Sequence, residues 1–412
     1  MEAPQQQRRI LGLLNPNQTR PPSTTTKTST SKPSSGHHEG STTAGGISII
    51  SQSKKIVDEE KTELSSREIF ETICKATTGD EWSLVEDFEF VRNLGAGAAA
   101  TVYLAKEKRS GYHVALKIQE SVTHADFEIE MHQRFNHPNI VHMFDSFEVP
   151  GAVEIQQFHK PENSAALLEA LLEEEEDPKE YLVMILEYCN QGSLFDTFCK
   201  GQNGYLSEPE AAHYFRGALD ALEYIHKEFN LIHCDCKTPN LLVHNKQIKL
   251  CDFGMTVSKE DKEISGGSPI YMAPEHLKAW KTGWADDFDQ ASDIYSLGIV
   301  LYEILAGCFP YEVIHDDEDL EDLHELGFFD QVDEFGEKDI FNTNPVLDLR
   351  DLDDQTSDEH WVIPSPVYPP HFSAEAQDLI SRLIEPCIEK RISIAEAKNH
   401  AWFQTFSSTL AT

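Results

Sequence analysis

The run SDIYSLGIVLYEILAG, residues 292–307, constrains the fold most strongly, because as a helix it would be apolar on every side. Such a helix has to be buried in the core of a large domain. Glu303 interrupts the run, and no apolar stretch in the chain reaches the roughly 18 residues that a bilayer span needs. We therefore expect a globular protein with a helical core and no membrane partner.

The chain ahead of this core has the pattern of a small sheet. Residues 87–118 alternate apolar and polar side chains and predict three short strands, with turn residues at GAG and RSG. A helix is expected over 125–135, ended by the proline of NHPNI, and two more strands over 142–148 and 181–188. Five strands and one helix therefore precede the helical core.

The character of the sequence changes at Leu206, after which helices predominate. Ser207 and Glu210 have the spacing of a capping box that opens a helix. Further helices are predicted over 374–384 and 393–403. The succession of a strand-rich part and a helix-rich part indicates an α+β fold.

Composition separates a tail and two insertions from these parts. Residues 1–57 are dense in Ser, Thr, Pro and Gln, so we expect a disordered regulatory tail, with a linker to residue 80, rather than a targeting peptide. Residues 149–180 and 311–360 are strongly acidic and are predicted to be solvated insertions that could dock basic protein partners. The net charge of −37, from 34 basic and 71 acidic residues, argues against nucleic-acid binding.

The eight cysteines carry no disulfide or zinc pattern. No secretory signal precedes them, so reduced thiols in the cytoplasm or nucleus are expected. Cys234 and Cys236 alone make a poor zinc site, because no second Cys or His pair follows at finger spacing.

Six features follow one another along the chain: GAGAAATV, VALK, a helical glutamate, HCDCKTPN, DFG and APE. In this order and spacing they resemble the signature set of the eukaryotic protein kinases over residues 85–405. The resemblance implies a bilobal fold, with a five-stranded antiparallel sheet and one helix in an N-lobe (85–188) and a mainly helical C-lobe (189–405).

The resemblance also implies roles in phosphoryl transfer from ATP to protein hydroxyls. Asp235 would accept the proton of the attacking hydroxyl, and Lys237 would meet the γ-phosphate. Asn240 and Asp252 would bind Mg²⁺. Lys117 would pair with the α- and β-phosphates. Glu128 would hold the Lys117 side chain in place, and Glu130 is the alternative to Glu128 for that role.

The nucleotide-binding positions follow by the same resemblance. Leu186 would be the gatekeeper, and the backbone of Glu187–Cys189 would read the adenine. Other residues around the nucleotide would be Leu94, Gly95, Ala96, Gly97, Val102, Ala115, Leu242 and Cys251. Lys237 and Ser268 match serine/threonine-directed kinases, while Glu275 with Arg391, and Asp293, match scaffold positions.

Three departures from the family pattern bear on regulation and substrate choice. Cys234 stands where an arginine usually grips an activation-loop phosphate, so we expect activity without such phosphorylation, although Ser258 and Ser265 remain sites for it. Ala99 and Ala100 replace the usual aromatic and third glycine of the glycine loop, which predicts weaker ATP binding. Pro239 replaces a frequent acidic residue, so a basic substrate preference cannot be assumed.

Two other function classes stay open at this point. A pseudokinase scaffold is favoured by the loop alanines and Cys234, and an acidic histone-binding module rests on net charge alone. Within the kinases, the stretches around residues 81–108 and 127–140 look most like the Aurora group, whose basic activation-loop motif is absent. The protein substrate and the oligomeric state are not predicted.

Overall fold

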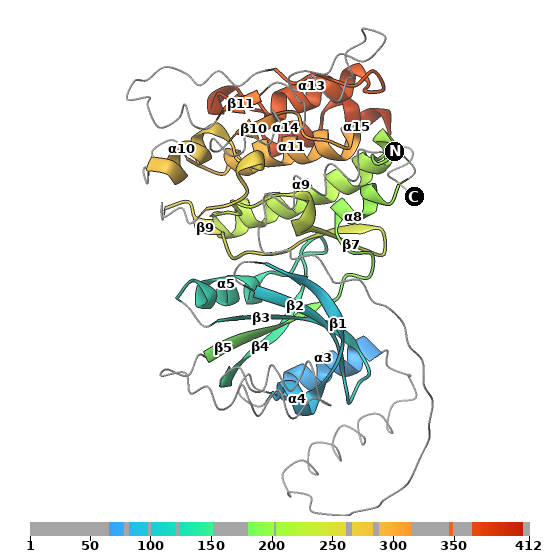
Figure 1. The fold of residues 1–412 in the computed structure, drawn as a ribbon, viewed down its shortest axis with the longest axis vertical. Coiled ribbons are helices and arrows are strands. Elements are labelled where there is room, and N and C mark those ends of the chain that lie inside the picture. Colours follow the sequence, from blue (N-terminus) through green and yellow to red (C-terminus); the bar gives the residue numbers. More distant parts are fainter. Residues whose placement is uncertain are drawn as a thin grey trace, which may run out of the picture. The chain divides into compact units, whose positions relative to one another are not determined.

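The computed structural model describes residues 66–77, 82–97, 100–120, 123–150, 180–201, 203–260, 266–282, 288–314, 346–348 and 365–406. They fall into two compact units (Figure 1). The smaller unit takes its described residues from 66–118 and 147–183, and the larger from 119–146 and 184–406. The predicted tail 1–57 and most of both acidic insertions lie outside the described residues.

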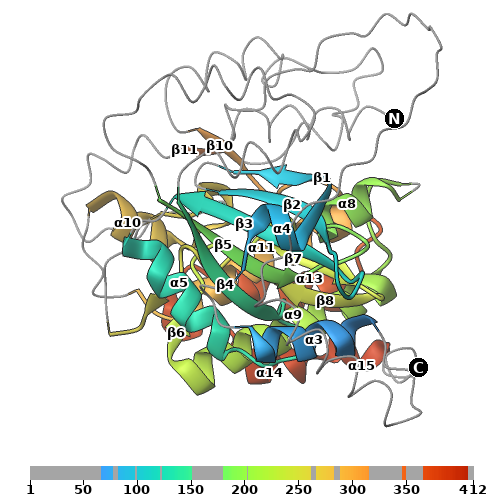
Figure 2. The same ribbon diagram turned by 90° about the horizontal axis from the view of Figure 1, so that it is seen from below.

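A five-stranded sheet follows the order β1-β2-β3-β5-β4, as Figure 2 shows. The strands are β1 (Phe88–Ala96), β2 (Ala100–Glu107), β3 (His113–Glu120), β4 (Met143–Pro150) and β5 (Glu180–Glu187). This confirms the predicted five strands. β3 is buried along six consecutive residues, as expected for a central strand covered on both faces. The turn between β2 and β3 uses Gly111 at φ 72, a left-handed conformation that glycine adopts without steric cost.

The smaller unit also contains two helices that precede the sheet, α3 (Ser66–Ala76) and α4 (Leu84–Asp87). The prediction of an unstructured linker to residue 80 is therefore wrong at its C-terminal end. Phe70 of α3 is fully buried, and its ring lies 5.4 Å from that of Tyr112 and 6.2 Å from that of Trp82. Burial of these aromatic side chains stabilises α3.

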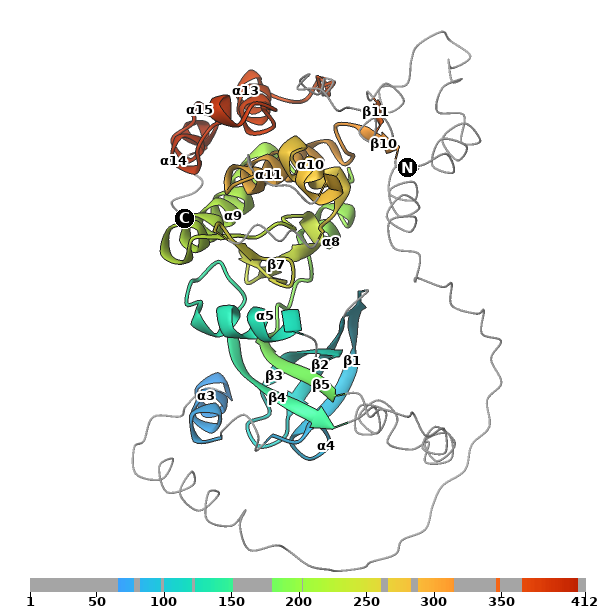
Figure 3. The ribbon, with the colours of Figure 1, turned by 90° about the vertical axis from the view of Figure 1, so that its left-hand side faces the viewer.

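The larger unit is mainly helical. Its helices are α5 (Thr123–Arg134), α8 (Leu194–Cys199), α9 (Glu208–Phe229), α10 (Pro274–Thr282), α11 (Ala291–Ala306), α13 (Ala374–Leu383), α14 (Ile394–Lys398) and α15 (Ala401–Thr405). Its short strands are β6 (Leu231–Ile232), β7 (Leu241–His244), β8 (Gln247–Leu250), β9 (Val257–Ser258), β10 (Glu312–Ile314) and β11 (Val346–Asp348). Figure 3 shows α13, α14 and α15 gathered together at the C-terminal end of the described chain.

Most predicted helices are present, with three differences. The capping box at Ser207 and Glu210 opens α9 as expected. Helices α8 and α10 were not predicted. The single helix expected over 393–403 is divided into α14 and α15, because the His400 side chain accepts a hydrogen bond from the Trp402 amide and starts a new helix.

The helix α5 was assigned to the N-lobe, but it groups with the larger unit. The Phe135 ring, just after α5, lies 4.8 Å from Phe253 and 4.9 Å from Phe229. Met131, Phe135 and Ile140 belong to the same buried cluster as the C-terminal helices. These contacts explain why the boundary differs from the predicted single division at residue 188.

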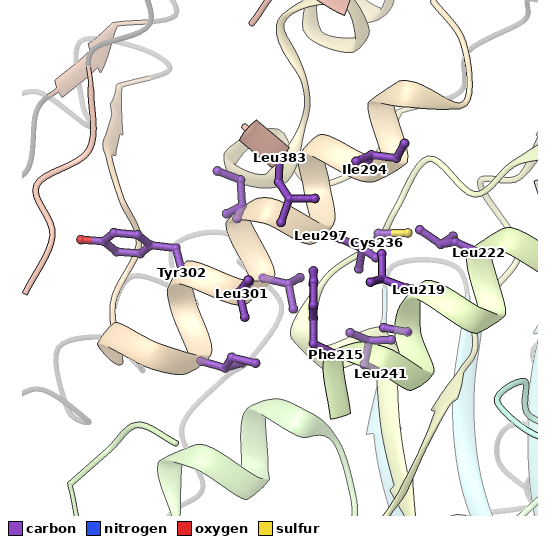
Figure 4. Close-up of a cluster of buried hydrophobic side chains, with 14 of the residues drawn as sticks. Phe215, Leu219, Leu222, Cys236, Leu241, Ile294, Leu297, Leu301, Tyr302 and Leu383 are labelled. Atoms are coloured by element: carbon purple, nitrogen blue, oxygen red, sulfur yellow. The ribbon is translucent and has the colours of Figure 1, made fainter. Parts of the chain in front are cut away.

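Helix α11 is buried along nearly its whole length in the core of the larger unit, as its all-round apolar pattern predicts. Figure 4 shows its residues Leu297 and Leu301 beside Phe215 and Leu219 of α9. Gly298 permits the close approach of α13, because a Cβ there would lie 2.8 Å from the Cβ of Leu383. In the described part of the chain, no helix combines the length and the apolar character that crossing a bilayer requires.

Candidate active site

A buried carboxylate on α11, Asp293, fixes the start of the segment that carries Asp235. Its two oxygens accept hydrogen bonds from the amides of His233 (2.8 Å) and Cys234 (3.0 Å). Burial alone would raise the pKa of Asp293, but the hydrogen bond and charge of His226, 2.8 Å away, outweigh it and lower the pKa. Cys234 is thereby held at φ 67, in the left-handed region that costs a non-glycine residue energy.

Three polar side chains, those of Lys237, Ser268 and Asn240, meet around Asp235. The Lys237 ammonium lies 2.7 Å from Oδ2 of Asp235 and donates to the Ser268 hydroxyl at 2.9 Å. That hydroxyl in turn donates to Oδ1 of Asp235 at 2.9 Å. The Asn240 amide nitrogen donates to both Oδ2 and the backbone oxygen of Asp235, each at 2.9 Å. The sequence placed Asp235, Lys237 and Asn240 together in the HCDCKTPN segment, and the resemblance to kinases put the Ser268 hydroxyl near Asp235, where the structure has it.

The two expected metal ligands lie on segments that are bonded to each other. The amide of Cys251, next to Asp252, donates to the backbone oxygen of Asn240 at 2.9 Å. Asp252 is exposed and has φ 64. Because the Asn240 side-chain nitrogen bonds to Asp235, its amide oxygen is the atom that suits a cation. An amide oxygen and a carboxylate are hard donors and fit Mg²⁺.

The described residues also place Glu128 near the DFG segment. A Cβ added to Gly254 would lie 3.4 Å from Oε2 of Glu128 and 3.6 Å from Oδ1 of Asp252. Both carboxylates therefore approach this glycine. Phe253, which lies between Asp252 and Gly254 in the sequence, is buried. Its ring lies 4.8 Å from that of His132 and 5.2 Å from that of His233. Glu130, the competitor for the Glu128 role, is exposed on α5.

The smaller unit carries the remaining predicted phosphate-binding residues. Lys117 is buried on β3, two residues after buried Ala115. Gly95 pairs with Val102 where β1 and β2 approach the glycine loop, and the amide of Gly97 donates to the oxygen of Ala100 at 2.8 Å. Leu94 is half-buried, and Ala96 is exposed beside it. Ala98 and Ala99 lie outside the described residues.

The segment expected to read adenine is buried at its ends. Leu186, Glu187 and Cys189 are all less than a tenth exposed. Burial, together with the nearby carboxylate of Glu187, raises the pKa of the Cys189 thiol to about 12. Leu242 on β7 and Cys251 after β8 are partly exposed. A buried ion pair between Glu187 and Lys249, at 2.7 Å, was not predicted from the sequence.

Comparisons with known proteins agree with this geometry. The protein kinase domain model matches residues 88–403. The chain belongs to the protein kinase family. It is 28% identical to the serine/threonine protein kinase OSK3 of Oryza sativa over 80% of this chain, which spans about half (52%) of that relative. It is 29% identical to an Aurora kinase of Encephalitozoon cuniculi, covering 77% of this chain and 94% of that protein, and 30% identical to an Aurora kinase of Dictyostelium discoideum, covering 78% and 66%.

In this kinase domain the Cys234 side chain packs in an apolar cluster. The cluster consists of Ile232, Cys234, Ala279 and Phe288, with Met255 and Val257 packed against it. Burial raises the pKa of the Cys234 thiol well above its usual range, so the thiol is neutral. Strand β9 pairs with β6 beside this cluster, Ile232 opposite Val257. The chain from DFG to APE (252–275), which we call the activation segment, is thus attached to the segment that carries Asp235 by apolar packing and a strand pair.

The scaffold pair of the kinase domain is a buried salt bridge. Both terminal nitrogens of Arg391 donate to the Glu275 carboxylate, at 2.5 Å and 3.0 Å. Arg391 also donates to the backbone oxygens of Glu385 and Ala291. The pair therefore ties α10, which ends the activation segment, to the start of α11 and to the chain after α13.

A buried polar cluster around Glu303 was not predicted. The Oε2 atom of Glu303 accepts hydrogen bonds from Tyr271 at 2.7 Å and from Thr238 at 3.0 Å. Glu303 is fully buried, and burial raises its pKa to about 8. Thr238 follows Lys237 directly, and Tyr271 lies three residues after Ser268. The one sequence signal was the charge of Glu303 within the apolar C-terminal part of α11.

Proposed function

We propose that this kinase domain is catalytically active and transfers the γ-phosphoryl group of ATP to serine or threonine hydroxyls of proteins. The observation that carries the proposal is the bonded set of Asp235, Lys237, Asn240 and Ser268. We propose residues 85–405 as the domain, in agreement with the span of the family model. Its location would be the cytoplasm or the nucleus.

In the proposed reaction, Asp235 accepts the proton of the substrate hydroxyl. The hydroxyl oxygen bonds to the γ-phosphorus as the bond to the β–γ bridging oxygen breaks, and ADP leaves. Lys237 and Lys117 neutralise charge on the phosphates. Asn240 and Asp252 would hold Mg²⁺, which supplies further charge neutralisation when bound. These side chains mainly orient the reactants, which is the larger part of catalysis in phosphoryl transfer.

The hydroxyl of Ser268 supports an aliphatic alcohol as the acceptor. It already bonds to Oδ1 of Asp235 and to the Lys237 ammonium. The side chain of a substrate serine or threonine is as short as that of Ser268, so its hydroxyl would reach the Asp235 carboxylate from a similar distance between backbone and carboxylate. The acidic insertions 149–180 and 311–360 are proposed to attract basic protein partners by charge alone.

We further propose that activity does not need a phosphate on the activation segment. A phosphate needs a cationic partner to order the loop. Cys234 is neutral, and its apolar cluster already attaches the segment next to the strand pair β6–β9. Treatment with phosphatase should therefore leave most of the activity intact.

The test is incubation with labelled ATP, Mg²⁺ and a mixed serine/threonine and tyrosine peptide library. Wild type should label serine and threonine, and Asp235→Asn should lower the rate at least about hundredfold. Asp378→Asn, an exposed aspartate on α13, is the matched control and should retain wild-type activity. Equal background from wild type and Asp235→Asn, with ATP binding retained, would favour a pseudokinase scaffold.

A further inference from the structure

The ion pair between Glu187 and Lys249 lies at the end of the segment expected to read adenine. The Lys249 ammonium is 2.7 Å from Oε2 of Glu187, and the two side chains are 11% and 2% exposed. Burial makes this contact hard to replace, because breaking it would leave one buried charge without its partner. Glu187 is the last residue of β5, and Lys249 belongs to β8.

Glu187 is also bonded to the chain just before β4. Its backbone amide donates to the oxygen of His142 at 2.8 Å, and the His142 amide donates to Oε2 of Glu187 at 3.2 Å. The same carboxylate oxygen therefore joins three segments of the chain. The backbone at Glu187 has little freedom to rotate while these bonds persist.

The other end of the segment is attached to the same β-hairpin. The amide of Gln191 donates to Val243 at 3.1 Å, and the amide of Val243 donates to Gly192 at 2.8 Å. Val243 lies on β7, opposite Ile248 and next to the pair Leu242–Lys249. Residues 188–190 therefore run between two attachments that both belong to the hairpin of β7 and β8.

This hairpin leads at its other end to the expected metal ligands. Asn240 precedes β7, Asp252 follows β8 by two residues, and the Cys251 amide donates to Asn240. One hydrogen-bonded hairpin thus attaches to both the segment that would read the base and the residues that would hold the phosphates through Mg²⁺.

We infer that Glu187 and Lys249 are positioning residues that set the preference of this kinase for adenine over guanine nucleotides. The inference rests on the proposed function, in which the backbone of Glu187–Cys189 reads the base. Adenine offers an amino donor where guanine offers a carbonyl acceptor, so discrimination requires backbone donors and acceptors in fixed positions. Loss of the ion pair would let the segment turn and accept either base.

The experiment measures kcat and KM for ATP and for GTP in wild type, Lys249→Met and Glu187→Gln. Both variants should lower the ATP-over-GTP preference in kcat/KM by about tenfold or more, chiefly by raising KM for ATP. The peptide KM should stay within about twofold of wild type, since Ser268 and Asp235 are not involved. Lys249→Arg retains the charge and should restore most of the preference.

Lys246→Met is the matched control, because Lys246 is an exposed lysine on the turn of the same hairpin. An unchanged preference in Lys249→Met, the same loss in Lys246→Met, or a rise in kcat when the pair is broken would overturn the inference. If Lys249→Met does not fold, Glu187→Gln, which keeps the size of the side chain, decides the question.

Calorimetric titration with Mg²⁺-ATP and Mg²⁺-GTP separates this inference from the proposed function. A wild type that transfers no phosphoryl group but prefers ATP in binding would overturn the proposed activity and leave the inference to be judged on the same variants. A wild type that binds both nucleotides equally would overturn the inference itself.

Discussion

The hydroxyl of Ser268 donates a hydrogen bond to Oδ1 of Asp235 at 2.9 Å, although the two residues are 33 positions apart. Ser268 belongs to the activation segment and Asp235 to the segment after β6. This bond, together with the Lys237 ammonium that donates to the same hydroxyl, links the two segments at the carboxylate proposed to accept the substrate proton.

We expect Ser268→Ala to lower kcat roughly tenfold to hundredfold, because the carboxylate of Asp235 loses one of the bonds that orient it. Ser268→Thr keeps the hydroxyl and should retain most of the activity. Steady-state kinetics at saturating ATP and peptide check this, with Ser381→Ala on the exposed side of α13 as the control. Wild-type kcat in Ser268→Ala would show that the bond does not orient the base.

The buried carboxyl of Glu303 predicts a pH dependence of stability. Burial raises its pKa from 4.5 to about 8, so the folded state holds a proton that the unfolded state releases above pH 4.5. The protonated form therefore contributes stability that is complete below pH 4.5 and is lost as pH rises to about 8. The difference corresponds to roughly 5 kcal/mol at most.

Glu303→Gln lacks this titration and keeps an oxygen for Tyr271 and Thr238. Relative to wild type, it should gain stability steadily between pH 5.5 and pH 8.5, as measured by urea unfolding. Glu375→Gln, at an exposed position of α13, should follow the wild-type curve. Parallel pH profiles for wild type and Glu303→Gln would contradict the assignment of a buried neutral acid.

The salt bridge between Glu275 and Arg391 should be far more important for stability than one on the surface. Arg391→Met leaves the buried Glu275 carboxylate unpaired and should reduce the free energy of unfolding by about 3–5 kcal/mol. Arg67→Met breaks an exposed pair with Glu71 on α3, 2.9 Å long, and should cost no more than about 0.5 kcal/mol. Similar losses in the two variants would mean that burial is not what gives the Arg391 pair its importance.

The helix α3 lies outside the span of the family model, which starts at residue 88, yet Phe70 is fully buried. We expect Phe70→Ala to destabilise the smaller unit by about 3–5 kcal/mol, because it removes the ring between Trp82 and Tyr112. Lys75→Ala, exposed on the same helix, should change stability by less than about 0.5 kcal/mol. Urea unfolding followed by tryptophan fluorescence measures both, and equal effects would show that α3 packs only loosely.

Sequence reasoning succeeded where the residues of the site are close in the chain. Asp235, Lys237 and Asn240 lie within six positions, so the pattern of one short segment predicts that they meet. The contact of Glu303 with Thr238 spans 65 positions, and that with Tyr271 spans 32, so only the packing of α11 brings them together. No local pattern encodes such a contact.

The missed elements have similar physical causes. Helix α3 directly follows the Ser- and Thr-rich tail, and its order depends on the packing of Phe70 against Trp82 and Tyr112, which come later in the chain. The break between α14 and α15 depends on the His400 side chain, which accepts a hydrogen bond from the Trp402 amide and caps α15, and the apolar pattern of the sequence does not reveal such a cap. The ion pair of Glu187 and Lys249 requires the end of β5 to lie close to β8, and the spacing of the two residues in the sequence does not fix this.

The parallel pairing of β10 and β11 has a consequence for protein engineering. Glu312 lies opposite Val346 and Ile314 opposite Asp348, so the chain leaves at one end of the pair and returns at the other. A tight turn can close only antiparallel strands, whereas parallel ones need a crossover of about a dozen residues or more. A segment that replaces residues 315–345 must therefore have its two ends separated by at least the length of these strands. A compact inserted domain with adjacent termini would break the pairing of β10 and β11.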